Sequence, residues 1–106
     1  MKAFTKSKRG DIVTIKFKEN FTQEKISDLR PVLRDSLEKG VKTVKIDFAN
    51  VEHIDSPGIG LLVATYNTLQ TKEGELIINN VKSDIVELFS VLQLDRRFTI
   101  KPAVKS

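Results

Sequence analysis

Hydrophobic and polar residues alternate along several stretches of this chain, and a period of two is typical of half-buried strands. The clearest case is the stretch that carries Val13, Ile15 and Phe17 on one face, with Thr14 and Lys16 on the other. Strands predicted in this way cover residues 3–7, 11–17, 43–48 and 75–79, followed by residues 94–100 as a loop that can end in a last strand. The first two are expected to pair as an antiparallel hairpin.

Between the strands, apolar residues recur every three or four positions, which predicts amphipathic helices. These helices cover residues 20–39 and 57–72, with a final one capped by Ser83 or Asp84. In the first helix we expect Asn20 as the N-cap with Gln23 as its capping-box partner, and Gly40 just beyond the end. Pro31 interrupts that pattern, so it either kinks the helix or marks its true start.

Strands that alternate with helices of this length favour right-handed parallel crossovers. Lys45 and Asp47 alternate with core positions in their strand, so the helices are expected to pack mainly on one face of the sheet. The sequence therefore predicts a single α/β domain over residues 1–106, ordered from about residue 3 to residue 100. Its sheet is mixed, mostly parallel and four- to five-stranded, the chain is expected to be monomeric when free, and residues 102–106 are expected to be a frayed tail.

The charge, the cysteine content and the length of the apolar runs argue against several classes of function. Lys and Arg number 18 and Asp and Glu 14, a net charge of +4 that is spread along the chain with few aromatic residues interleaved. We therefore expect no direct contact with nucleic acid. There is no cysteine, which suits a reducing compartment. No apolar run approaches the roughly 20 residues of a membrane span, and no signal peptide is evident, so we expect a cytoplasmic protein without membrane contact.

One junction between a predicted strand and a predicted helix stands out, Ile-Asp-Ser-Pro-Gly-Ile-Gly-Leu-Leu at residues 54–62. Open α/β sheets bind ligands beyond the carboxyl ends of their strands, where this loop lies. Ser56 followed by Pro57 predicts a helix start with Ser56 as the N-cap. A hydroxyl at that partly positive end can cap the helix, carry a phosphate or act as a nucleophile. Gly58 and Gly60 would allow close backbone approach and leave the hydroxyl unshielded.

An enzyme finds little support in these residues. The hydrolase pattern Gly-x-Ser-x-Gly does not occur, and His53, three residues before Ser56, is the only histidine. One histidine without cysteines is a poor start for a metal site. We therefore expect no catalytic residue, no metal and no cofactor.

The sequence from Val44 through the Asp55–Gly60 segment resembles the STAS domain of bacterial anti-sigma factor antagonists. In that family the loop carries the motif Asp-Ser-[Ser/Thr]-Gly-[Leu/Ile]-Gly, and this chain has Asp-Ser-Pro-Gly-Ile-Gly. The similarity continues in order through Gly74–Ile78 and Val86–Leu94, so it covers nearly the whole chain. The element order predicted above is also that of the family.

The resemblance implies a regulatory switch. Such a domain binds a GHKL-type anti-sigma factor serine kinase when it is unphosphorylated, and this frees the sigma factor. The kinase phosphorylates a loop serine with ATP, and a PP2C-type phosphatase reverses the reaction. Of the family's two hydroxyl positions this chain has Ser56 at the first and Pro57 at the second, so Ser56 is the expected phosphorylation site. The alternative is a STAS subunit that docks on a transporter ATPase or another signalling complex without being phosphorylated.

Partner contacts are expected in the loop and on the exposed side of the following helix. Leu61 and Ala64 lie off the apolar stripe of that helix, so they form either an exposed contact patch or a partly buried pair. The expected partner-binding residues are Asp55, Ser56, Pro57, Gly58, Ile59, Gly60, Leu61 and Ala64.

Overall fold

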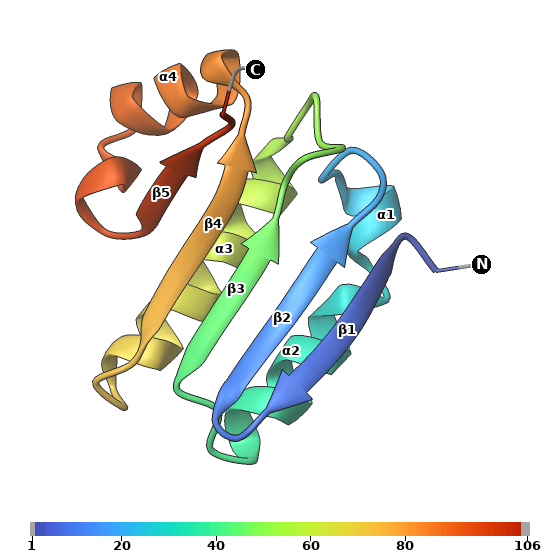
Figure 1. The fold of residues 1–106 in the computed structure, drawn as a ribbon, viewed down its shortest axis with the longest axis vertical. Helices are drawn as coiled ribbons and strands as arrows, with labels where there is room; N and C mark the ends of the chain where they lie inside the picture. Colours follow the sequence, from blue (N-terminus) through green and yellow to red (C-terminus); the bar gives the residue numbers. More distant parts are fainter. Residues whose placement is uncertain (1, 105–106) are drawn as a thin grey trace.

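A five-stranded sheet in the order β1-β2-β3-β4-β5 forms the centre of the protein, seen in a computed structural model that describes residues 2–104 (Figure 1). Strand β1 is antiparallel to β2, and every other neighbouring pair is parallel. The predicted strands are therefore confirmed, including the last one. Their bounds are β1 Phe4–Arg9, β2 Ile12–Phe17, β3 Thr43–Asp47, β4 Glu75–Val81 and β5 Thr99–Pro102.

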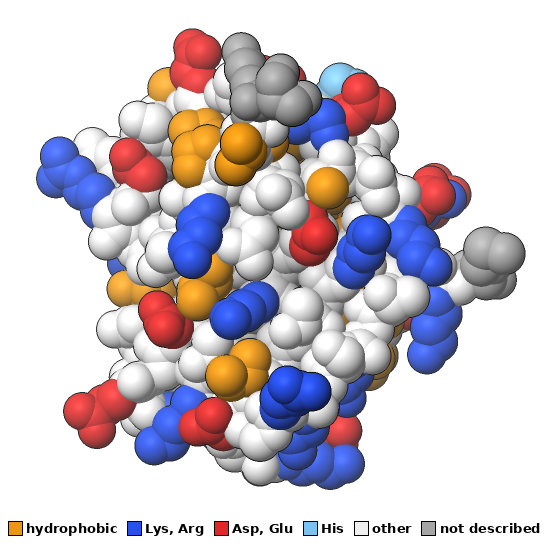
Figure 2. Space-filling model, viewed as in Figure 1, with side chains coloured by type: hydrophobic (Ala, Val, Ile, Leu, Met, Phe, Trp, Pro, Cys, Tyr) orange, Lys and Arg blue, Asp and Glu red, His pale blue; other side chains and the backbone are white. Residues whose placement is uncertain are grey.

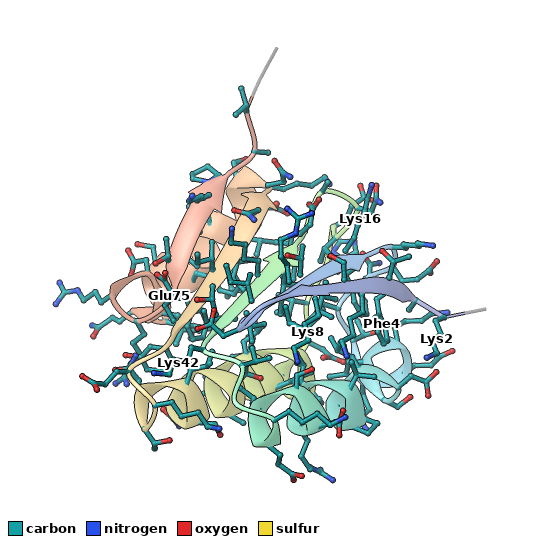
Figure 3. The ribbon with its side chains drawn as sticks, turned by 60° about the horizontal axis from the view of Figure 1, so that its bottom comes forward. Lys2, Phe4, Lys8, Lys16, Lys42 and Glu75 are labelled. Atoms are coloured by element: carbon teal, nitrogen blue, oxygen red, sulfur yellow. The ribbon has the colours of Figure 1, made fainter. Side chains whose placement is uncertain are left out.

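Helices connect the parallel strands. From β2 to β5 the order of the strands across the sheet is their order in the chain, so successive crossovers all move across the sheet in one direction. Because such crossovers are right-handed, they bring the helices to one face. Figure 3 shows α2 and α3 side by side on that face, with Lys16 on the other side of the sheet. The predicted fold class is confirmed. The helices are α1 Gln23–Ile26, α2 Leu29–Glu38, α3 Ser56–Gln70 and α4 Ser83–Val91, with a 3₁₀ turn η1 at Leu94–Arg96.

The core lies between the sheet and these helices. All six phenylalanines of the chain are buried there, and successive ring centroids are 4.8 to 6.5 Å apart. Such spacings allow edge-to-face and offset packing. The row begins on β1 and ends on α4 and the segment before β5, so α4 shares one core with the first strands. The row is Phe4, Phe17, Phe21, Phe48, Phe89 and Phe98.

The opposite face of the sheet carries mostly polar side chains. Lys16 on β2 is paired in register with Asp47 on β3, and Thr14 with Lys45. Figure 2 shows lysine and arginine side chains spread over this face and no large hydrophobic area among the side chains described. Within residues 2–104, no helix has the length and apolarity needed to cross a membrane.

Two details of the first helical segment differ from the prediction. Residues 20–39 form two helices with a break at Ser27–Asp28, and Pro31 lies in the first turn of α2. Its missing N–H has no intrahelical partner to lose there, so Pro31 marks the true start of the main helix. The N-cap of α1 is Thr22, not Asn20, because the Asn20 side chain is engaged elsewhere. Gly40 follows α2 with a φ of +90°, as expected of a residue beyond a helix end.

The last third of the chain needs two corrections as well. The N-cap of α4 is Lys82, and Ser83 is the first helical residue, so neither predicted cap holds. Pro102 belongs to β5, and the N–H of Ala103 donates to the carbonyl of Val81. The expected frayed tail therefore does not begin at Pro102, and residues 105–106 lie outside the described part.

Candidate functional site

The candidate site lies where β3 passes into α3, at the carboxyl edge of the sheet (Figure 1). The backbone leaves β3 at Asp47, and the Asp47 Oδ1 atom accepts hydrogen bonds from the Ala49 N–H at 2.8 Å and the Asn80 side chain at 3.0 Å. The ammonium group of Lys82 donates to the Ala49 carbonyl. The start of the loop is thus bound to the end of β4.

The cap of α3 is Asp55, and the prediction that Ser56 is the cap is wrong. The Asp55 Oδ1 atom accepts from the Gly58 N–H at 2.8 Å, and its Oδ2 atom accepts from the Gln23 N–H at 2.9 Å. One carboxylate therefore satisfies amide groups at the N-termini of two helices, α3 and α1, and its charge complements both helix dipoles. Ser56 and Pro57 occupy the first two positions of α3.

A second set of hydrogen bonds, from the segment before α1, holds the middle of the loop. The Asn20 Oδ1 atom accepts from the N–H groups of Glu52 at 3.0 Å and His53 at 3.1 Å. The Phe21 N–H donates to the His53 carbonyl at 3.0 Å, and Phe21 forms a parallel bridge with Ile54. The segment before α1 therefore acts as a short extra strand beside the loop. Because both sides of the loop are hydrogen-bonded, the position of Ser56 is well defined.

The two glycines of the motif have different roles. A Cβ atom on Gly58 would lie 2.2 Å from the Phe21 carbonyl oxygen, so only glycine permits this close approach of α3 to the segment before α1. A Cβ atom on Gly60 would have no heavy atom within 4 Å. The expectation of close backbone approach therefore holds for Gly58, whereas Gly60 leaves the helix backbone exposed at the surface.

The Ser56 side chain is exposed, and within the described residues its hydroxyl makes no hydrogen bond. Apart from the N–H of Ser56 itself, the amides of the first helical turn already have hydrogen-bond partners or are absent. The Gly58 N–H donates to the Asp55 side chain, the Ile59 N–H donates to the Asp55 carbonyl at 3.0 Å, and Pro57 has no N–H. A group attached to Ser56 would find the anion-binding end of α3 already occupied by the Asp55 carboxylate.

The predicted partner residues divide into two sets. Ser56, Pro57, Gly60 and Ala64 are exposed and follow one side of α3. Leu61 is only 6% exposed, so of the two alternatives given for this residue the exposed contact patch is excluded. It is buried because α3 packs against α2 as well as against the sheet. In the remaining set, Asp55 and Ile59 are half-buried and Gly58 is buried.

Three residues that hold the site were not expected from the sequence. Asn20 and Lys82 bind the loop from segments far away in the chain, and Gln23 supplies the second partner of Asp55. The only available signal was the polar character of Asn20 before a helical pattern, which was interpreted as an N-cap. His53 is exposed and forms no hydrogen bond with Ser56 in the described part of the chain.

Comparison with known proteins places these features in a family. The sequence model of the STAS domain matches residues 3–106. An anti-sigma-B factor antagonist of Staphylococcus aureus is 32% identical over 69 residues, which are 65% of this chain and 64% of that relative. The match thus spans slightly less than two-thirds of the curated relative.

Solved structures share the fold. The Bacillus cell fate determinant SpoIIAA in its phosphorylated form superposes with a TM-score of 0.77 at 21% identity, over 97% of this chain and 93% of that one. An anti-sigma-factor antagonist (STAS) domain protein from Planctomyces limnophilus gives a TM-score of 0.80 at 18% identity, over 96% of this chain and 91% of that one. At such identities the likeness is one of fold.

Proposed function

This chain belongs to the STAS domain family, and on that premise we propose that it is an anti-sigma factor antagonist whose binding is controlled by phosphorylation of Ser56. In this proposal the unphosphorylated protein binds a GHKL-type anti-sigma kinase in the cytoplasm and so releases a sigma factor. The kinase modifies Ser56 with ATP, and a PP2C-type phosphatase restores the binding form. The S. aureus relative is described as an anti-sigma-B factor antagonist, which supports this choice among the functions of STAS domains.

The observation that carries the proposal is the state of Ser56. Its hydroxyl is exposed and without a hydrogen bond within residues 2–104, whereas the loop around it is bound from both sides. A side chain that had only to start the helix would be engaged with the helix backbone, and Asp55 already fulfils that task. A serine presented on a fixed loop is suited to reaction with an external phosphate donor.

The surface beside Ser56 suits a docking protein. Gly60 and Ala64 follow Ser56 at intervals of four residues, so the three lie along one side of α3. All three are exposed and small, which lets another backbone or helix approach α3 closely. Partner contacts through Ser56, Pro57, Gly60 and Ala64 would place the phosphorylation site inside the interface.

Phosphate on Ser56 would oppose this docking by its charge. A phosphoserine carries about −1.5 to −2 charges at pH 7. Because the Asp55 carboxylate already accepts from the Gly58 N–H, a phosphate on Ser56 would compete with it for the start of α3 and would stand next to an existing negative charge. In the complex it would have to lose its water and face any acidic groups of the partner, such as those that hold magnesium in a kinase site.

The experiment that tests the proposal compares two aspartate substitutions. Wild type, Ser56→Ala, Ser56→Asp and Ser83→Asp are titrated against the purified anti-sigma kinases of the same organism by calorimetry. We expect Ser56→Asp to bind at least about tenfold more weakly and Ser56→Ala to bind like wild type. Ser83→Asp, at the exposed first position of α4, is the matched control and should also bind like wild type. Equal binding by Ser56→Asp and wild type would contradict the switch and favour docking without phosphorylation.

A further inference from the structure

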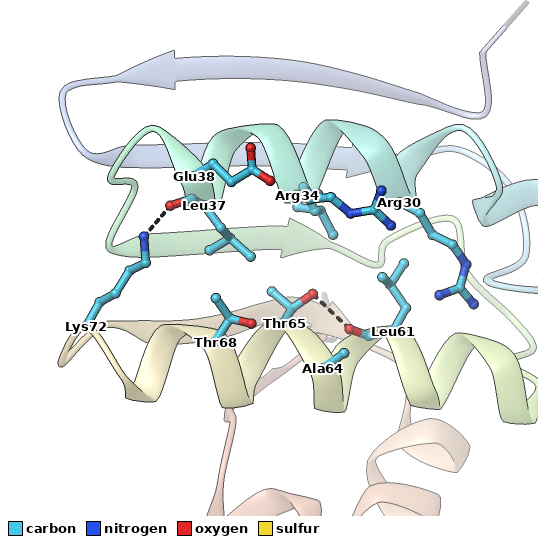
Figure 4. A pocket seen from close by; sticks show the side chains of 10 residues that line it. Arg30, Arg34, Leu37, Glu38, Leu61, Ala64, Thr65, Thr68 and Lys72 are labelled. Atoms are coloured by element: carbon cyan, nitrogen blue, oxygen red, sulfur yellow. Dashed lines mark hydrogen bonds between the residues drawn. The ribbon is translucent and has the colours of Figure 1, made fainter.

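A groove of about 460 Å³ lies between α2 and α3, on the helix-covered side of the molecule (Figure 4). Its floor is apolar and consists of Leu33 and Leu37 from α2 and Leu61 from α3, all buried. Its rim carries the polar side chains of Arg30, Arg34, Glu38, Thr68 and Lys72, and Ala64 and the buried Thr65 complete the α3 wall. An apolar floor with charged groups around it is the usual composition of a binding surface for a peptide or a protein segment.

The charge of this rim is not balanced by the protein itself. Arg30 and Arg34 lie one turn apart on α2, and neither forms an ion pair within the described residues. By contrast, Asp35 and Lys39 on the outer side of the same helical segment pair with each other at 3.1 Å. Lys72 donates to the Leu37 carbonyl, and among residues 2–104 Glu38 is the only acidic group that lines the groove. The rim thus carries three cations and one anion.

We propose that the groove binds an acidic segment with aliphatic side chains, contributed by the same partner protein that docks on α3. The two guanidinium groups would receive carboxylates, for which their planar donor geometry is suited. An aliphatic side chain between these carboxylates would cover the leucine floor. The proposal rests on the proposed function, because it assigns the segment to the partner that binds beside Ser56.

The dimensions of the groove limit the segment. Thr68 lies seven positions beyond Leu61, so the α3 wall between them is about 10 Å long at the rise of an α-helix. This length accommodates about three residues of extended chain or two turns of a helix. The Leu61 end is the end nearer to the start of α3, so the groove continues the surface around Ser56 and Gly60. Glu38 lies at the other end, so the carboxylates of the segment are expected beside Arg30 and Arg34.

The test uses two synthetic peptides as probes, each of about 12 residues with leucines at the same positions. One carries glutamates and the other lysines at the remaining positions, and each is titrated into the isotopically labelled protein by NMR. We expect saturable shifts of the amides of Leu33, Thr65 and Thr68 with the glutamate peptide only. Arg30→Glu combined with Arg34→Glu should weaken this binding about tenfold or more. Arg96→Glu combined with Arg97→Glu, at exposed positions outside the groove, is the matched control and should have no effect.

Several results would overturn the proposal. These are absent or unsaturable shifts, shifts at other residues, equal binding of the lysine peptide, or an unchanged affinity of the double variant at the groove. If that double variant does not fold, the single change Arg34→Ala at an exposed position takes its place, and it too must weaken binding. An oligouridylate that displaces the glutamate peptide with the same shifts would assign the groove to nucleic acid instead. None of these results depends on Ser56, so a failure here differs from a failure of the phosphorylation switch.

Discussion

Two helices of this protein begin with an exposed serine after a parallel strand, and the two helix starts differ in what surrounds the serine. Ser56 starts α3 after β3, and Ser83 starts α4 after β4. The start of α3 is capped by the Asp55 carboxylate, which also binds α1. The start of α4 has Lys82 at its N-cap position, and within the part of the chain that the structure describes it has no side-chain cap bond. A serine is thus the first residue of both helices, but of these two described starts only that of α3 has a capping side chain, which also binds a distant segment of the chain.

The surfaces that follow the two serines differ as well. After Ser56 the exposed side of α3 continues with Gly60 and Ala64, whereas α4 exposes Asp84 and Glu87 within its first two turns. The acidic start of α4 suits its own helix dipole but would repel a phosphate donor. The proposed function assigns the switch to Ser56 and not to Ser83 for this reason. Of the two serines, Ser56 is the one whose loop is held by hydrogen bonds on both sides and that adjoins an uncharged, exposed helix side.

The largest expected effect is on partner binding. Ala64→Arg places a long charged side chain in the middle of the exposed side of α3, and we expect the affinity for the anti-sigma kinase to fall by about 100-fold. Ser90→Arg, on the exposed end of α4, should leave the affinity unchanged. Both variants should keep the melting temperature of wild type, because neither position is buried. Normal binding by Ala64→Arg in a calorimetric titration would exclude this side of α3 from the interface.

The next effect concerns the close approach of α3 to the segment before α1. Gly58→Ala forces a Cβ atom against the Phe21 carbonyl, and we expect it to lower the free energy of unfolding by about 2–3 kcal/mol. Gly60→Ala meets no neighbour and replaces a helical glycine, so it should raise the same quantity by about 0.5–1 kcal/mol. Urea denaturation measures both. Changes of the same sign would show that the tight contact at Gly58 is not what distinguishes the two glycines.

A smaller effect is expected from the caps themselves. Asp55→Ala removes the acceptor for two backbone amides, and we expect it to cost about 2 kcal/mol of unfolding free energy. In α4 the Asp84 carboxylate accepts, within the described residues, only from the adjacent Ile85 N–H, so Asp84→Ala should cost less than about 0.5 kcal/mol. Thermal and urea denaturation of the pair would test this difference. Equal losses would remove the asymmetry between the two helix starts.

The smallest effect should be that of Ser56 on stability. If Ser56 were the cap, Ser56→Ala would cost about 1 kcal/mol, but because Asp55 is the cap we expect a change below about 0.5 kcal/mol. Ser56→Asp should be equally mild, since the favourable helix dipole and the nearby Asp55 charge oppose each other. Circular dichroism during urea denaturation measures both changes. A large loss with Ser56→Asp would mean that charge at Ser56 acts by unfolding the loop, and a large loss with Ser56→Ala would mean that Ser56 contributes to the cap.

The sequence predicted the order of strands and helices well because alternation and helical periodicity are local properties. It predicted the N-cap residues poorly, because neighbouring residues in the sequence are equally able to cap a helix. Asp55 and Ser56 can each cap a helix, and the choice is decided by the Gln23 amide, which lies 32 residues away. Asn20 looked like a cap but serves the amides of Glu52 and His53, across a similar separation. Such choices depend on the tertiary structure.

The burial of Leu61 could not be decided from the sequence for a related reason. The apolar stripe of α3 was derived for a helix that contacts one surface, but α3 packs on the sheet and also against α2. The second contact widens the buried sector to include Leu61 and Thr65, whose hydroxyl donates to the Leu61 carbonyl at 2.8 Å. The groove between these helices combines residues from two segments. No pattern within either segment could indicate it.

Phosphorylation at one serine and not the other tests the central claim most directly. Wild type, Ser56→Ala and Ser83→Ala are incubated with the organism's anti-sigma kinases and ATP, and modified residues are located by mass spectrometry of peptides. We expect one phosphate per chain, on Ser56, in wild type and in Ser83→Ala, and none in Ser56→Ala. Phosphate on Ser83 or on any other residue of Ser56→Ala, or an unmodified Ser56 with every kinase, would contradict the account.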